Sequence, residues 1–230
     1  LGFSSRSPYL GELIKRNFPW KIEDIPVVLA AKTPPYAWTV STKSGWKSWD
    51  DFRKAKRRIR LGVASQLSSE LVIIKDLIDH GREVTTASMK TTELITSTIA
   101  GDLDIWNVVT SKTFQDPYNA GDITPLVFLS DKRDPRFPKI PTHSELGMPK
   151  HWVNFQAIRM WYAPIGTPKN ITQSIERRIT KLLDDPGIKD WAEKSGFVKG
   201  LMSGEAAKAA QIGAVKIIKD NWDLYKKYGG

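Results

Sequence analysis

The chain has 230 residues, with 35 Lys and Arg against 25 Asp and Glu, a formal net charge of +10, and no cysteine. That length allows one large domain or two smaller lobes, and the absence of cysteine excludes disulfides, thiol nucleophiles and cysteine-ligated metal centres. No apolar run approaches the roughly 20 residues needed to span a bilayer, and no signal-peptide pattern follows Leu1.

Short β-rich runs alternate with amphipathic segments through the first two thirds of the chain. This alternation predicts an α/β fold with largely parallel sheet. We expect strands at Val27–Ala31, Ala37–Ser41, Ile59–Val63, Glu83–Thr86, Asp104–Val108 and Leu126–Leu129, and helices at Trp49–Lys56, Ser69–His80 and Thr92–Ala100.

The last third of the chain is predicted to be mostly helical. Thr167 and Pro168 form a helix start, because proline at the first helical position loses no hydrogen bond. Apolar residues recur at helical spacing up to Leu182, and Asp185-Pro186-Gly187 is expected to end that helix. A second, long helix is expected from Ser203. The apolar stripes of both helices are expected to pack in the core.

A dense basic run extends from Arg53 to Arg60, with six basic residues in eight. Such a run occurs in nucleic-acid-binding proteins, but no RNP signature, zinc-finger spacing or basic zipper accompanies it. The alternative is the solvated end of a helix, where cations suit the negative pole of the helix dipole. Diffuse positive charge also raises the encounter rate with a small anionic ligand.

The turn after Val63 is a candidate anion site. A strand runs directly into a helix there, and such a turn directs several free backbone N–H groups at one point. The serines of the turn add hydroxyl donors. The structural alternative is ordinary capping by serine at a helix start.

Groups for catalysis or metal binding are scarce. The three histidines, His80, His143 and His151, are not at metal-ligand spacing with one another or beside an acidic cluster. No phosphate-binding glycine loop and no nucleophile elbow is present. The sequence therefore predicts a protein that is not an enzyme and carries neither a cofactor nor a metal.

Two blocks of the chain carry a family resemblance. Residues Pro138–Pro149 are similar to the pattern Pro-x-hydrophobic-Pro-Thr-x-x-Glu-x-Gly-hydrophobic-Pro, and Ala163–Lys169 are similar to Ala-Pro-x-Gly-Thr-Pro-Lys. Both patterns are found in the solute-binding proteins of tripartite tricarboxylate transporters, the Bug family. The chain resembles this family in order over essentially its whole length.

The resemblance implies a two-lobed, periplasmic-binding-protein-like (flytrap) α/β fold with a C-terminal helical segment. One lobe would comprise residues 1–42 and 161–230, and the other residues 43–160. The implied function is capture of a small organic acid (a mono-, di- or tricarboxylate, aromatic ones included) between the lobes for delivery to a membrane permease. The implied location is periplasmic or extracellular, with membrane association in a Gram-positive-type or archaeal envelope, after removal of a signal peptide.

The resemblance also implies which residues bind the ligand. Arg159 would clamp a carboxylate or form a surface ion pair, and Trp106 would stack on the ligand or pack in the core. The complete implied set is Ser4, Ser5, Ser65, Gln66, Leu67, Ser68, Ser69, Lys90, Thr91, Thr92, Trp106, Asn107 and Arg159.

The chain departs from the family pattern in two places. The loop Gly62–Ser69 lacks two of the family's inner glycines, and Glu70 stands where the family usually has histidine. The family's first strand and its glycine-rich loop have no counterpart, so we expect a second chain or copy to cover an exposed sheet edge. These departures leave open an alternative function as a sensor or assembly component without transport, and more remotely a nucleic-acid-binding domain.

Overall fold

A computed structural model describes residues 1–5, 20–64, 69–195 and 200–228. The chain divides into two compact units: unit 1 contains Leu1–Pro34 and Ala157–Ile217, and unit 2 contains Pro35–Gln156 and Ile218–Gly230. The lobes expected from the sequence, 1–42 with 161–230 and 43–160, assign residues 35–42, 157–160 and 218–230 differently. The first two differences follow from strand pairing, because the strand at Tyr36–Ser41 forms its hydrogen bonds with strands of unit 2, and the strand at Ile158–Tyr162 with strands of unit 1.

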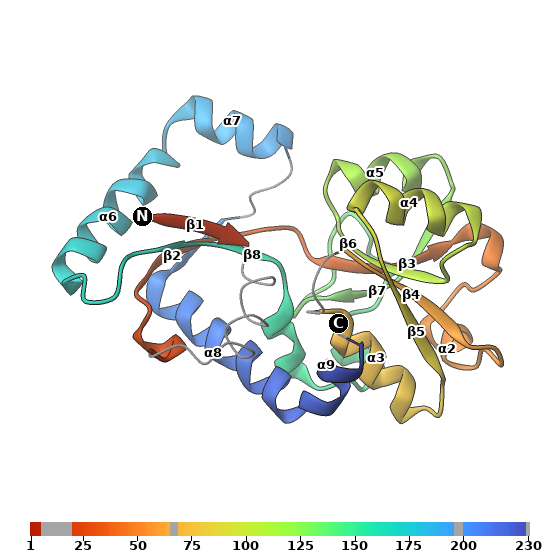
Figure 1. Cartoon of the computed structure of the whole chain (residues 1–230). Coiled ribbons are helices and arrows are strands. Elements are labelled where there is room, and N and C mark those ends of the chain that lie inside the picture. Colours follow the sequence, from red (N-terminus) through yellow and green to blue (C-terminus); the bar gives the residue numbers. More distant parts are fainter. Residues whose placement is uncertain (6–19, 65–68, 196–199, 229–230) are drawn as a thin grey trace. The chain divides into compact units, whose positions relative to one another are not determined.

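Unit 1 contains a four-stranded sheet in the order β1-β8-β2-β9 (Figure 1). Every neighbouring pair in it is antiparallel, so the expectation of largely parallel sheet is wrong here. Strands β1 and β9 form the edges, and the expected covering by another chain stays a prediction. The strands are β1 (Gly2–Ser5), β2 (Val27–Lys32), β8 (Ile158–Tyr162) and β9 (Leu201–Ser203), and the short helix η1 (Ile22–Asp24) precedes β2.

Helix α8 (Gly204–Asp220) packs on one face of the unit 1 sheet through residues such as Ala207, which is fully buried with Ala30 and Met160. Its first residue lies against strand β2. A Cβ on Gly204 would stand 2.1 Å from the carbonyl oxygen of Val27. Only glycine therefore allows the helix to begin this close to the sheet.

Helix α6 (Lys169–Leu182) packs on Val28 and Leu29 of β2 through Ile175 and Ile179. The expected stop after α6 is present, but Pro186 also opens a further helix, α7 (Pro186–Ser195). Asp185 caps this new helix, since its Oδ1 accepts hydrogen bonds from the backbone N–H groups of residues 187 and 188.

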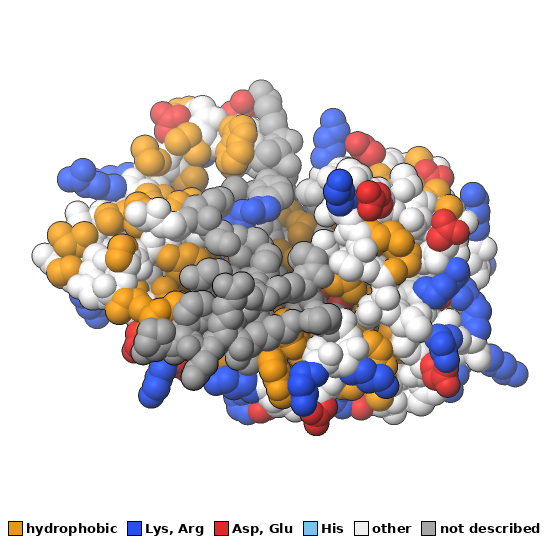
Figure 2. Space-filling model, in the orientation of Figure 1, with side chains coloured by type: hydrophobic (Ala, Val, Ile, Leu, Met, Phe, Trp, Pro, Cys, Tyr) orange, Lys and Arg blue, Asp and Glu red, His pale blue; other side chains and the backbone are white. Residues whose placement is uncertain are grey.

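The apolar stripe of α6 and α7 is only partly buried. Ile171, Leu182 and Trp191 are 46, 56 and 58% exposed, and Figure 2 shows apolar side chains gathered over these helices. The expectation that the stripe up to Leu182 packs in the core is therefore wrong for Ile171 and Leu182.

Unit 2 contains a five-stranded mixed sheet in the order β5-β4-β6-β3-β7. Strands β5, β4 and β6 are parallel, while β3 runs antiparallel to both β6 and β7. The expectation of parallel sheet thus holds for three strands only. The strands are β3 (Tyr36–Ser41), β4 (Ile59–Val63), β5 (Val84–Ser88), β6 (Ile105–Val109) and β7 (Ile123–Leu129).

Helices cover both faces of the unit 2 sheet (Figure 1). Helices α4 (Thr91–Ala100) and α5 (Lys112–Asn119) pack on one face over a core that contains Trp106, Phe114 and Phe128. The other elements of the unit are η2 (Thr42–Ser44), α2 (Trp49–Arg53), α3 (Glu70–Asp79), η3 (Ser144–Leu146), η4 (Lys150–Phe155) and α9 (Trp222–Tyr228).

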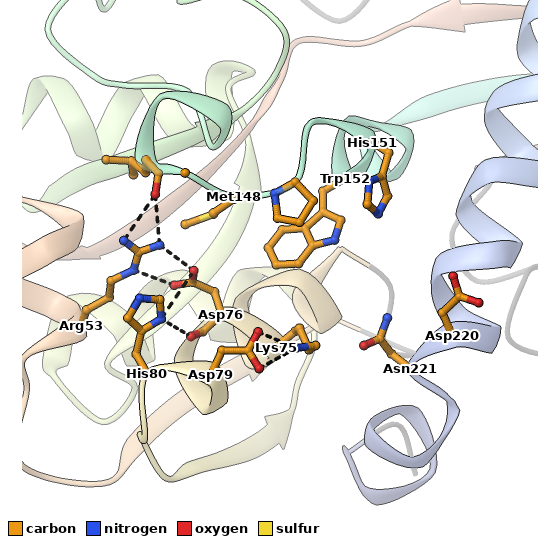
Figure 3. Close-up of a pocket in the computed structure, with 13 residues that line it drawn as sticks. Arg53, Lys75, Asp76, Asp79, His80, Met148, His151, Trp152, Asp220 and Asn221 are labelled. Carbon is orange, nitrogen blue, oxygen red and sulfur yellow. Dashed lines mark hydrogen bonds and ion pairs between the residues drawn. The ribbon is translucent and has the colours of Figure 1, made fainter.

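The basic run begins with an ion pair that joins α2 to α3. Arg53 donates from Nε and Nη2 to Asp76 at 2.9 and 2.6 Å (Figure 3). The indole N–H of Trp49 donates to the same carboxylate at 2.9 Å. Burial lowers the pKa of Arg53, but the bonds to Asp76 outweigh it and the pKa is raised. Helix α2 ends at Arg53, three residues earlier than expected, and the chain then turns towards β4.

The rest of the run is also largely paired inside unit 2. Arg60 donates to Asp104 at 2.9 Å and Arg57 at 2.5 Å, while Arg58 pairs with Glu83. Burial of Asp104 tends to raise its pKa, but the hydrogen bonds from Arg60 and Arg57 outweigh it and lower the pKa. Four arginines of the run are therefore paired with carboxylates of the same unit, which leaves few cations for the phosphates of a nucleic acid.

Replacing the buried carboxylate tests this role. A group whose pKa is lowered by folding adds stability above its unfolded pKa of about 3.8, and that stability is lost as the pH falls through the folded value. We expect Asp104→Asn to lower the free energy of unfolding by about 1–3 kcal/mol at pH 7 and to flatten its decline in acid. Chemical denaturation between pH 3 and 7 measures both effects. The exposed Asp102→Asn is the matched control, and equal effects of the two changes would contradict the prediction.

The close approach of α8 to β2 gives a second stability prediction. We expect Gly204→Ala to destabilise the protein by about 1–3 kcal/mol, because the added methyl group overlaps backbone oxygens that cannot move independently of the sheet. Gly2→Ala is the control, since a Cβ there meets nothing within 4 Å. Thermal unfolding followed by circular dichroism measures the change, and an unaltered melting temperature for Gly204→Ala would refute the steric argument.

Candidate ligand-binding site

The topology of unit 2 contains one switch point within its parallel strands. From β4 the chain passes through α3 to β5 on one side, and then through α4 to β6 on the other side of β4. The chain therefore leaves β4 towards one edge of the sheet and leaves β6 towards the other edge. In open α/β sheets, ligands bind outside the carboxyl ends of the strands at such a point.

Two helices begin at this edge of the sheet. Helix α3 follows β4, and α4 follows β5, which lies beside β4 with Val63 opposite Ser88. Each helix has ten residues, and its first turn presents unbonded N–H groups at the positive end of the helix dipole. Two such ends on neighbouring strands favour an anionic ligand.

A buried polar pair lies at the start of α3. Asn107 of β6 is 5% exposed and Ser69 is fully buried, and the Asn107 amide donates to Ser69 Oγ at 2.5 Å. Among the described residues, no hydrogen-bond partner reaches Asn107 Oδ1. A buried polar atom left without a partner costs about 1–3 kcal/mol, so this acceptor is suited to a donor from outside the chain, such as a hydroxyl group. The amide nitrogen has two N–H donors, and the one not used by Ser69 is available to an acceptor such as a carboxylate.

The neighbouring candidates Lys90, Thr91 and Thr92 open helix α4. Lys90 is its N-cap residue, and the backbone N–H of Lys90 donates to the carboxylate of Glu93 at 3.2 Å. All three side chains are exposed. The structure therefore brings these residues to the same edge of the sheet as Ser69 and Asn107.

Other candidates have different surroundings. Trp106 is 1% exposed within the core under α4 and α5, which favours packing over stacking on a ligand. Glu70 is 5% exposed in the first turn of α3. The candidates Ser65, Gln66, Leu67 and Ser68 lie outside the described residues.

The remaining three candidates belong to unit 1. Ser4 and Ser5 of β1 stand opposite Met160 and Arg159 of β8. Arg159 is partly buried and also stands opposite Ala31 of β2. Ser5 and Arg159 are thus cross-strand neighbours in the unit 1 sheet, a proximity that their separation in the chain does not suggest.

The most diagnostic sequence block has a structural role in unit 2. The Thr142 backbone N–H donates to Glu145 at 2.8 Å, and Thr142 Oγ1 accepts from the Glu145 backbone N–H at 3.4 Å, which is a capping box. A hydrogen bond from Arg133 and then the one from Thr142 lower the pKa of Glu145 to about 2. His143 is fully buried beside them, and burial lowers its pKa. The block shapes a turn, and His143 is a core residue.

Sequence reasoning missed a cavity of about 450 Å³ at the other end of α3 (Figure 3). The cavity is lined by the Arg53–Asp76 pair, the Lys75–Asp79 pair, His80 and the indole of Trp152. These residues are scattered between positions 53 and 221, and no spacing in the sequence marks them. Cations and carboxylates of the two pairs largely balance each other, so this cavity lacks the one-sided charge of an anion site.

The described residues show no sign of a metal centre or a membrane span. No group of three or more histidine and carboxylate side chains in them is placed to hold a metal ion. Nor does any helix in that part of the chain have the length and apolar character needed to cross a bilayer.

Solved structures with the same fold include several binding proteins. A TctC solute-binding protein from Polaromonas is 17% identical, with a TM-score of 0.76, over 98% of this chain and 77% of that one. A Rhodopseudomonas palustris protein with adipate is 18% identical, with a TM-score of 0.74, over 97% and 77%. MatC from Rhodopseudomonas palustris, with bound malate, is 16% identical, with a TM-score of 0.69, over 97% and 78%. These likenesses confirm the expected periplasmic-binding-protein-like fold.

Curated proteins contain no significant match to this chain. A family model, by contrast, matches residues 4–221, which is nearly the whole sequence. Its description is "Tripartite tricarboxylate transporter family receptor". The chain therefore belongs to the tripartite tricarboxylate transporter receptor family.

Proposed function

We propose that this protein is an extracytoplasmic receptor that binds a small organic carboxylate and delivers it to the permease of a tripartite transporter. The observation that carries the proposal is the pair of helix starts, α3 and α4, on neighbouring parallel strands, with Asn107 and Ser69 buried beside the first of them. Backbone N–H groups, hydroxyls and an amide are the groups that hold a carboxylate without a metal.

The relatives support the same class of ligand. One solved structure of the fold contains malate and another contains adipate, and both are dicarboxylates. The family description refers to a receptor of a transporter, which supports delivery to a permease and a location outside the cytoplasmic membrane. Binding by oriented dipoles is reversible, as delivery requires.

Capture of a ligand by such a receptor is a population shift, in which the ligand favours the state that it binds more tightly. A ligand shifts such an equilibrium only by its difference in affinity for the two states. In this proposal, groups of unit 2 at Asn107 and Lys90 hold a carboxylate of the ligand. Arg159, Ser4 and Ser5 of unit 1 stay proposed ligand contacts on the family resemblance.

A ligand screen tests the proposal directly. We expect at least one of malate, adipate, citrate and benzoate to raise the melting temperature, because a ligand at 100 times its dissociation constant adds about 2.7 kcal/mol of stability. Differential scanning fluorimetry measures the shift, with sodium chloride at equal ionic strength as the control. If no carboxylate in a broad panel stabilised the folded protein more than the salt did, carboxylate capture would be ruled out.

A substitution at the buried pair locates the site. We expect Asn107→Asp to weaken the affinity for the carboxylate found in the screen by about tenfold or more, because a hydrogen-bond donor is replaced by a like charge. Isothermal titration calorimetry at pH 7 measures the affinity. Asn119→Asp, at an exposed position at the end of α5, makes the same chemical change and should have little effect. Equal affinities of the two variants would place the ligand elsewhere.

A further inference from the structure

A hollow of about 480 Å³ lies on unit 2 beside the C-terminal ends of α2 and α3. Every residue that lines it is ionisable, one of them is acidic, and none is an apolar side chain. They are Asp50, Arg53, Lys54, Lys56, His80 and Arg82. The lining of the hollow therefore includes side chains from the first part of the basic run. The proposed carboxylate site lies at the other end of α3 and does not involve these side chains.

Two of the lining side chains are fixed by backbone carbonyls. Arg82 donates from Nη1 to the carbonyl of Ala55 at 2.7 Å and from Nε to the carbonyl of His80 at 3.2 Å. The His80 ring lies with Nδ1 2.7 Å from the carbonyl of Asp76 (Figure 3). Side chains held in this way lose little conformational entropy when a partner binds.

The charge of the hollow is not balanced within the chain. Arg53 is neutralised by Asp76, and Asp50 pairs with Arg53 as well. Lys54, Lys56 and Arg82 form no ion pair with any described carboxylate, whereas Arg57, Arg58 and Arg60 of the same run do. Three cations without an ion-pair partner, against the one remaining negative charge of Asp50, give this concave surface a net positive potential.

We infer that this hollow is a docking site for an acidic segment of a partner protein, whose Asp and Glu side chains pair with Lys54, Lys56 and Arg82. Acidic motifs are commonly recognised by clusters of basic side chains. A site for single-stranded nucleic acid would stack bases on Phe, Tyr or Trp side chains, and a membrane-binding surface would insert apolar ones. The lining of the hollow offers neither.

A model peptide tests the docking site. The probe is a fluorescein-labelled hexaglutamate peptide, and fluorescence anisotropy at low and physiological salt measures its affinity for the whole chain. We expect Lys54→Glu/Lys56→Glu to weaken binding by about tenfold or more, because two attractive charges become repulsive. Both lysines are exposed, and an unchanged melting temperature would verify that the variant is folded.

A charge-matched control variant distinguishes binding at this hollow from non-specific attraction to the positively charged protein. Lys132→Glu/Lys139→Glu makes the same change in net charge at two exposed lysines of unit 2 and should weaken binding less than about twofold, since distant charges are screened. Equal losses in the two double variants, or equal binding of a hexaglutamine peptide, would overturn the proposal. So would tighter, Lys54- and Lys56-dependent binding to an oligonucleotide or to phosphatidylglycerol vesicles.

Discussion

Two buried carboxylates determine how unit 2 is built. Asp76 on α3 and Asp104 just before β6 are almost inaccessible, and each accepts several hydrogen bonds from arginines of one short run. Burying a carboxylate is costly unless its charge is paired and its lone pairs are filled. Because Arg53 lies before β4 and Arg60 within it, the two pairs fix where this strand enters the sheet. The connection that leaves β4 at its other end, and with it the start of α3, is positioned by the same contacts.

Much of the α/β character could be predicted from local pattern, but the pairing of strands could not. Apolar runs such as Ile59–Val63 are typical of buried strands, and they lie where expected. The antiparallel sheet of unit 1 brings Gly2–Ser5 against Ile158–Tyr162, and periodicity says nothing about a partner so far along the chain. Helix α5 was missed because it is largely polar and contains Pro117. Local sequence propensity therefore predicts where helices and strands form, whereas long-range contacts determine which strands pair.

In the candidate site, too, local sequence predicts the elements but not the contacts between residues far apart in the chain. The serine-rich turn after Val63 predicts a helix start from local sequence alone, while the contact between Ser69 and Asn107 joins residues 38 positions apart. Strand alternation could have separated the two candidates on β6, because neighbouring residues point to opposite faces of a sheet. Trp106 faces the core under α4 and α5, so Asn107 faces α3. One side chain of that pair serves packing, and the other is available to a ligand.

Helix α3 separates two kinds of positive potential. Oriented N–H groups lie at its start, and the unpaired cations Lys54, Lys56 and Arg82 lie beside its end. Ten residues of helix span about 15 Å, nearly twice the Debye length of about 8 Å at physiological ionic strength. Formal charges at one end therefore add little attraction for an anion at the other. In the proposed function a carboxylate is held by dipoles and can be released, while in the inferred docking site the full charges remain available for a partner that binds through many contacts at once.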